Sequence, residues 1–232
     1  MTENQKLKME LLKEFAISDE PKSIEVCRAM YKFMVEDDAA PSAASPATDK
    51  KHLKDGVYYI CDDEKKTIVP FKATLTPPED AMGVLLVQGE RSIIIALRDC
   101  NDGEETTLTK QKDPSNLKGN YIDTCIDAVA DWNGQKNTEH LKAVGLSDNI
   151  NLSDGWYIPS MGEMLFIFTH RKEVNAALEK AGGQPIADDW YWTSTEHSAT
   201  TAWRLGLNSG PMIINTKAAY TFRVRPVSAF IS

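Results

Sequence analysis

The side chains that could carry out chemistry are scattered along this sequence of 232 residues. Its histidines are His52, His140, His170 and His197, and none of them belongs to an HExxH metalloprotease motif. The sequence also lacks the GxSxG motif of hydrolases and the P-loop of nucleotide-binding proteins. Ser194 precedes His197 by three residues, but no third group that would complete a catalytic triad is identifiable. We therefore expect a protein that is not an enzyme.

Cysteine and carboxylate spacing predicts no metal site and no cofactor. Cys27, Cys61, Cys100 and Cys125 are separated by 34, 39 and 25 residues, so no pair has the CxxC spacing of zinc or thioredoxin-type sites. We expect these cysteines to be reduced and mostly buried. Acidic turns could gather a cation, but such turns are commonly solvated. The two acidic groups are Asp62, Asp63 and Glu64, and Asn101, Asp102, Glu104 and Glu105.

Composition excludes two broad classes of partner. The chain has 34 acidic and 26 basic residues, a formal charge of −8, which argues against sequence-independent nucleic-acid binding. Its apolar runs are a few residues long, whereas a membrane helix needs about 20. The N-terminus has no unbroken apolar segment of a secretory signal. If Met1 is the true start, we expect synthesis in a cytoplasm without Sec export and without membrane insertion.

The N-terminal part is predicted to be a helical segment, residues 1–36, followed by a linker, residues 37–52. Leu7, Leu11 and Phe15 recur at helical spacing, and a second helix is expected from Ser18 to about Val35. Helices this short are marginal alone. Their apolar faces therefore pack either on the main domain or on a partner or another copy of the chain. The Ala/Ser/Pro-rich linker leads into a domain at 53–232.

That domain begins with β-strand patterns. Strands are expected at Val57–Ile60, Thr67–Phe71, Met82–Gln88 and Ser92–Leu97. The pair Gly89-Glu90 predicts a tight hairpin between the last two. The run Ile93–Leu97 is apolar on both faces, which is typical of a central covered strand.

Helices are predicted next, and strands follow them. Residues 120–132 have helical spacing, and a loop is expected after them. Ser160 and Glu163 form an S-x-x-E capping box that starts a helix from Met161 to about His170. A further helix ends at Gly182-Gly183. The last strands are predicted at Tyr191–Thr195, Ala202–Leu207, Pro211–Asn215 and Thr221–Val227. The fold class is therefore α+β, with antiparallel strands and two or more helices in the domain.

Large side chains near the C-terminus have two possible roles each. Trp156, Trp192 and Trp203 fit core positions, with an exposed sugar-stacking platform as the alternative. Arg223 and Arg225 alternate on one predicted strand and so share a face. One of them pairs with a buried carboxylate such as Glu196, or both are solvated.

The C-terminal third also resembles a family pattern over residues 150–230. Its blocks are Gly155-Trp156-Tyr157-Ile158-Pro159-Ser160-x-x-Glu163, then Tyr191-Trp192-Thr193-Ser194-Thr195-Glu196, then Ala202-Trp203, then Arg223-Val224-Arg225-Pro226-Val227. This order resembles the C-type-lectin-like domains of bacteria and phages, which are related in fold to formylglycine-generating enzyme. Members of this family are mostly uncharacterised, or act as surface and ligand-binding modules.

Two activities of relatives of this family are not expected here. Formylglycine generation needs reactive cysteines in the C-terminal core, whereas every cysteine of this chain precedes residue 126. Calcium-dependent sugar binding uses Glu-Pro-Asn or Gln-Pro-Asp, and here Gln184-Pro185 is followed by Ile186, which offers no hard oxygen ligand.

The resemblance implies a binding face on the segment between the Tyr191–Glu196 block and the last strand. Loops and strand surfaces on a rigid scaffold commonly carry recognition. An ordinary solvated surface is the alternative. The candidate ligand-binding residues are His197, Thr200, Thr201, Arg204, Asn208, Ser209, Lys217 and Tyr220.

The main functional hypothesis is a non-enzymatic phage virion-surface protein, a head or tail fibre or decoration subunit. It would assemble in the cytoplasm of the bacterial host, bind other virion proteins through its N-terminal helices, and display the lectin-like domain to a host-surface glycan or protein. A homo-oligomer, by analogy with fibres a trimer, is expected. The alternative is a bacterial cell-surface adhesin or secreted binding module of the same fold. An enzyme on this fold is a third hypothesis.

Overall fold

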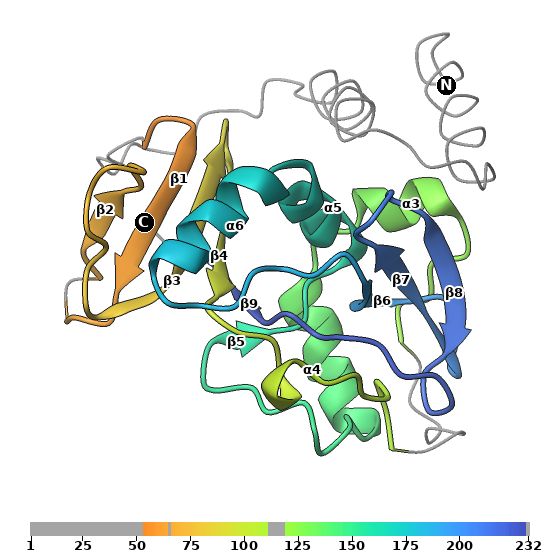
Figure 1. The fold of residues 1–232 in the computed structure, drawn as a ribbon. Coiled ribbons are helices and arrows are strands. Elements are labelled where there is room, and N and C mark those ends of the chain that lie inside the picture. The colour runs from red at the N-terminus through yellow and green to blue at the C-terminus, as the bar shows by residue number, and fades with distance from the viewer. Residues whose placement is uncertain (1–52, 65, 111–118, 231–232) are drawn as a thin grey trace, which may run out of the picture.

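The computed structural model describes residues 53–64, 66–110 and 119–230 (Figure 1). The helical segment predicted at 1–36 and the linker at 37–52 lie outside these residues. The described part is α+β, as predicted, and contains two antiparallel sheets.

The larger sheet has six strands, and every neighbouring pair is antiparallel. In spatial order these are β2 (Ile68–Pro70), β1 (Gly56–Cys61), β3 (Ala81–Gln88), β4 (Arg91–Ala96), β9 (Val227–Ser228) and β5 (Trp156–Tyr157). The first four strands match the predicted ones closely. The predicted hairpin at Gly89-Glu90 is confirmed, and Gly89 has the positive φ of 58° that such a turn favours.

Alternation of side chains explains why both faces of this sheet are covered. Val84 and Leu86 point to the core beneath the helices, together with Ile93 and Ile95 of the neighbouring strand. The intervening residues Leu85, Val87 and Ile94 join a second cluster on the opposite face. Because successive side chains of a strand point to opposite faces, an unbroken apolar run marks a strand buried on both sides. The predicted central strand is therefore confirmed.

Helices α5 (Met161–Thr169) and α6 (Arg171–Lys180) follow one another and lie against the sheets (Figure 1). Helix α6 packs on β1 and β3, and α5 packs on the smaller sheet. The predicted capping box is confirmed, since the Ser160 side chain accepts from the Glu163 N–H while the Glu163 carboxylate accepts from the Ser160 N–H. Every residue of α5 is buried, so this helix forms the centre of the core.

Two shorter helices differ from the prediction. The helix expected over 120–132 is only α3 (Cys125–Ala130), because the Thr124 side chain caps its start and Asp131 has extended backbone at its end. Helix α4 (Gly134–Val144) lies where a loop was expected. Its buried side is made by Gly134, Thr138, Leu141 and Val144, and only two of these are large apolar residues. That weak apolar pattern explains the error.

The smaller sheet has three strands in the order β6 (Trp190–Glu196), β7 (Thr201–Gly206) and β8 (Met212–Thr216), close to the predicted ranges. The single strand predicted at Thr221–Val227 is wrong. This segment forms isolated bridges at Phe222 and Arg223, and only Val227 enters a strand, β9. Pro226 precedes that strand and has no N–H to donate to a ladder.

The core positions predicted for the tryptophans are confirmed for Trp192 and Trp203, whereas Trp156 is only partly buried. Trp192 and Trp203 are buried, and their indole N–H groups donate to the backbone oxygens of Thr106 (2.9 Å) and Ile122 (2.8 Å). Trp156 is partly buried against the outer face of the larger sheet. The sugar-platform alternative is therefore wrong for Trp192 and Trp203.

The described cysteines are free thiols, as predicted. Cys61 and Cys100 are buried and Cys125 is partly buried, whereas Cys27 lies outside the described residues. Burial raises the pKa of the Cys100 thiol to about 11, so this thiol is unreactive at neutral pH. Within the described ranges, no helix is both long and apolar enough to cross a bilayer.

We predict that Trp192→Ala unfolds or severely destabilises the domain. Truncating a buried Trp costs about 3–5 kcal/mol, a large part of the ~5–15 kcal/mol of a typical domain. Trp192→Phe is the matched control, because it keeps one aromatic ring in the core while losing the N–H bond to Thr106 and part of the buried volume. Thermal melting should rank wild type above Trp192→Phe and Trp192→Phe above Trp192→Ala; a Trp192→Ala protein that melts with the wild type contradicts the core assignment.

Candidate functional site

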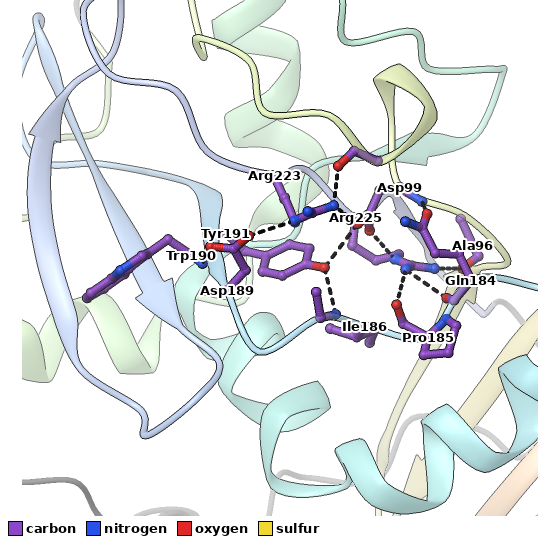
Figure 2. A network of polar contacts seen from close by, with 12 residues as sticks. Ala96, Asp99, Gln184, Pro185, Ile186, Asp189, Trp190, Tyr191, Arg223 and Arg225 are labelled. Carbon is purple, nitrogen blue, oxygen red and sulfur yellow. Dashed lines mark hydrogen bonds and ion pairs between the residues drawn. The ribbon is translucent and has the colours of Figure 1, made fainter.

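Three groups of polar side chains are candidate sites, and the first is centred on a buried ion pair. We call it the Asp99 cluster: Asp99, Gln184, Asp189, Tyr191, Arg223 and Arg225 (Figure 2). The side chains of Asp99 and Arg225 have no exposed surface and form an ion pair. Arg225 also donates to the backbone oxygens of Ala96 and Gln184, both at 2.9 Å.

The other members close the cluster around Asp99. The Tyr191 hydroxyl donates to Asp99 Oδ2 at 3.0 Å and accepts from the Ala187 N–H. Arg223 Nε donates to Asp189 Oδ2 at 2.9 Å, and its guanidinium lies 3.8 Å from Asp99. Burial raises the pKa of Asp99, and the charge of Arg225 opposes that shift. Every charged group here has a charged partner, so we assign the cluster a structural role.

The partner predicted for the arginines needs correction. Arg223 and Arg225 do reach one buried carboxylate, but it belongs to Asp99 and not to Glu196. Glu196 pairs with Lys217 and lies 3.3 Å from His140 Nε2. Sequence spacing gives no means of choosing between two carboxylates, since either is brought near only by folding.

Lys217 was predicted to be exposed, and this is wrong. Its side chain is 1% exposed and its ammonium is paired with the buried Glu196. A lysine is almost never fully buried unless paired, so the ion pair is the physical reason for its position. Lys217 therefore cannot contribute to an exposed binding face in this structure.

The structure separates the remaining predicted residues into three places. His197, Thr200 and Thr201 lie at the turn between β6 and β7, where His197 Nδ1 is 3.0 Å from Thr201 Oγ1. Asn208 and Ser209 lie at the opposite end of β7, in the turn to β8. Arg204 lies in the middle of β7, and the structure brings Tyr220 close to it.

Arg204 and Tyr220 belong to a surface that we call the Arg204 patch: Glu105, Trp190, Arg204, Ile213, Tyr220 and Phe222. The Arg204 guanidinium carbon lies 3.7 Å from the centroid of the Trp190 ring and 4.1 Å from that of Phe222. Ile213 is the cross-strand neighbour of Arg204 on β8. Ile213 and Tyr220 are among the exposed large apolar side chains.

The electrostatics of Arg204 set it apart from the other arginines described above. Among the described residues it makes no hydrogen bond and no ion pair, and its Nε is buried without a partner. Burial lowers the pKa of Arg204, while Tyr220 and Glu105 act in the opposite direction. Arg204 therefore contacts the protein through its ring-stacked faces and not through hydrogen bonds to the described residues.

Sequence reasoning missed four members of this patch, namely Glu105, Trp190, Ile213 and Phe222. Trp190 and Phe222 are aromatic residues that directly precede two of the quoted family blocks. That position in the sequence could have indicated that they lie near the candidate site. Glu105 lies far from Arg204 in the chain, and no local pattern connects them.

A surface hollow of about 660 Å³ beside Trp132 is the third candidate. Its polar floor is already used by the fold, since the Glu163 carboxylate accepts from the Ser160 N–H and from the Tyr157 hydroxyl. The Arg91 guanidinium lies 4.0 Å over the Trp132 ring and covers it. No group of three His, Cys, Asp or Glu side chains among the described residues could hold a metal ion. The Arg204 patch is therefore the best candidate site.

The sequence matches no protein-family model and no curated protein. Its fold is similar to that of a fimbrial protein from Bacteroides ovatus, known from a crystal structure, with a TM-score of 0.54 at 15% sequence identity. The match covers 77% of this chain and 49% of the fimbrial protein, so the chain spans about half the length of that protein. The likeness shows an α+β fold and gives no family assignment.

We predict that Arg225→Met is far more damaging alone than together with Asp99→Leu. The single change leaves a buried carboxylate without its main counter-charge, which typically costs about 3–5 kcal/mol. The double change removes both charges, and both variants lose the same bonds to Ala96 and Gln184. Urea unfolding should therefore show the double variant to be the more stable of the two. Equal or lower stability of the double variant would refute the structural role assigned to this pair.

Proposed function

We propose that this chain is a bacterial cell-surface protein that acts in attachment through the Arg204 patch, without catalysis. The observation that carries the proposal is the similarity of its fold to a fimbrial protein, over most of this chain. Because a fold hosts many functions, the similarity supports the proposal only in combination with a suitable site.

The Arg204 patch is that site. It presents an exposed aromatic ring, an exposed aliphatic side chain and a guanidinium without a hydrogen-bond partner among the described residues. Tyrosine and arginine are enriched where proteins bind ligands or partners, because each offers contact area together with hydrogen-bond donors. Three members of the patch, Trp190, Arg204 and Ile213, lie on the adjacent strands β6, β7 and β8, and such a sheet is a rigid support for a binding face.

The proposal replaces the virion hypothesis as the main one. The comparisons offer no support for a phage protein, and they favour the alternative of a bacterial surface module. The proposal keeps two features of the virion hypothesis. They are an N-terminal segment for anchoring or oligomerisation and an outward-facing α+β domain.

We predict that the protein is exposed on intact cells of the bacterium that encodes it. Antibody labelling and brief protease treatment of intact cells should both detect it, whereas a cytoplasmic control protein should become accessible only after lysis. The gene upstream of the Met1 codon should encode an export signal or lipoprotein motif. Detection only after lysis would contradict the proposed location.

We also predict that residues 1–36 carry assembly and not folding. Deleting them should leave the melting temperature of the domain unchanged, while light scattering shows a lower oligomeric state than for the full chain. A domain that loses its cooperative melting transition would instead show that this segment packs on the main domain. An unchanged oligomeric state would place the assembly interface elsewhere.

A further inference from the structure

We propose that two copies of this chain pair through the free edge of strand β8, which joins their smaller sheets into one continuous sheet. This interface goes beyond the proposed attachment function and does not depend on it. Three observations carry it: the open hydrogen-bonding edge of β8, the protection of the other strand edges, and the lack of charge around β8.

Strand β8 is an outer strand of the smaller sheet, in which it pairs with β7 alone (Figure 1). It is five residues long, and its register with β7 runs without a bulge. A hydrogen bond beyond each end of the strand shows which backbone groups face the neighbouring chain. The Lys217 N–H donates to the Thr200 oxygen at 2.9 Å. The Gly206 N–H donates to the Pro211 oxygen, also at 2.9 Å.

The alternation of an antiparallel ladder extends this pattern along β8. Bonded pairs alternate with non-bonded pairs, so Ile213 and Asn215 exchange backbone bonds with β7. The N–H and C=O groups of Met212, Ile214 and Thr216 therefore point away from β7, where no strand of the described ranges lies. Of these groups, the Thr216 oxygen alone accepts from the described backbone, in the turn after β8. The edge thus offers backbone donors and acceptors to a further strand.

The other strand edges of the described ranges are protected. The same alternation directs Pro70 of β2 outward, where it has no N–H to offer, and exposed lysines flank that strand. Strand β5 is only two residues long. The outer side of β6 is occupied, because Tyr191 forms a bridge with Arg223. Strand β8 has none of these features, so it is the edge that is open to pairing.

A second copy of β8 fits this edge in an antiparallel register centred on Ile214. In that register the Ile214 N–H of each copy donates to the Ile214 oxygen of the other, and Met212 lies opposite Thr216. The same groups meet across a two-fold axis, so the contact is self-complementary and closes with two chains. Ile213, which is 40% exposed, then lies opposite Asn215 of the second copy and loses part of its exposed surface.

The charge around β8 favours a second copy over a partner that is recognised by charge. Between Leu205 and Phe222 the sequence contains one charged residue, Lys217. Its ammonium is buried and paired with Glu196. The whole chain has a formal charge of −8, so two copies approach each other most easily through an uncharged surface. A charged partner would find no exposed counter-charge on this edge.

Pairing through β8 also places the two Arg204 patches relative to each other. Cross-strand neighbours point to the same face of a sheet, and Ile213 is the cross-strand neighbour of Arg204. The patches of both copies therefore lie on one face of the joined sheet. Under the proposed attachment function, the pair presents two binding surfaces side by side, and its avidity exceeds the affinity of one patch.

The test is hydrogen exchange of the full-length chain, followed residue by residue over a range of protein concentrations. The Ile214 N–H has no described partner within one chain, whereas it is bonded in the pair. We therefore expect its protection to rise with concentration, together with an increase of about twofold in mass by light scattering. The Ile213 N–H is the internal control, because it donates to β7 and is protected at every concentration.

Two proline variants test the edge itself. Ile214→Pro and Thr216→Pro each remove an outward N–H and leave the bonds to β7 in place, since proline is tolerated where an edge N–H faces solvent. At a concentration where the wild type pairs, both should show about half of its mass. The control Leu75→Ser removes a 51% exposed apolar side chain in the segment after β2 and should pair as the wild type does. Circular dichroism melts show that each variant folds.

Three results would overturn the proposed interface. Fast exchange of the Ile214 N–H at every concentration shows that the edge stays open. Equal protection at every concentration, including high dilution, shows that a segment of the same chain covers it. Wild-type mass in folded Ile214→Pro and Thr216→Pro places the contact between copies elsewhere. None of these results bears on exposure at the surface of intact cells, which tests the proposed function separately.

Discussion

The ion pair between Asp99 and Arg225 is the contact on which the arrangement of the two sheets depends. Asp99 follows β4 and Arg225 precedes β9, so the pair fixes the place where the C-terminal segment enters the larger sheet. Tyr191, a residue of β6, donates to the same carboxylate and connects the smaller sheet to it (Figure 2). Desolvating two charges is costly, and the bonds from Arg225 to two backbone oxygens help to offset that cost.

The same constraint positions the candidate site. Trp190 and Phe222 directly precede Tyr191 and Arg223, which belong to the Asp99 cluster, and the Trp190 ring points away from that cluster (Figure 2). Both rings then contact the Arg204 guanidinium. The Arg204 patch is thus built on residues adjacent to the Asp99 cluster. A site supported in this way holds its geometry better than one carried by loops.

In the structure, the residues of the family pattern have roles in capping, core packing and charge pairing. Ser160 and Glu163 cap α5, Trp192 and Trp203 fill the core, and Arg225 neutralises Asp99. Each block therefore specifies folding rather than binding. The Arg204 patch draws on residues outside the blocks: Arg204 and Tyr220 lie between the last two blocks, and Glu105 lies ahead of the first. This agrees with a fold that resembles a fimbrial protein at only 15% sequence identity, because such a scaffold constrains few surface residues.

By itself, the sequence determined the local structure: the strands from β1 to β4, the hairpin at Gly89, the start of α5 and the burial of Trp192. These features depend on residues a few positions apart, so their patterns are visible before folding. Tertiary structure alone decided that Asp99 is the partner of Arg225, that Lys217 is buried against Glu196, and that Phe222 packs against Arg204. Helix α4 was also decided by tertiary structure, because small and polar residues make up half of its buried face and give no clear helical apolar pattern. Partners far apart in the chain are selected by packing, and a charged side chain carries no local signal of the counter-charge it will meet.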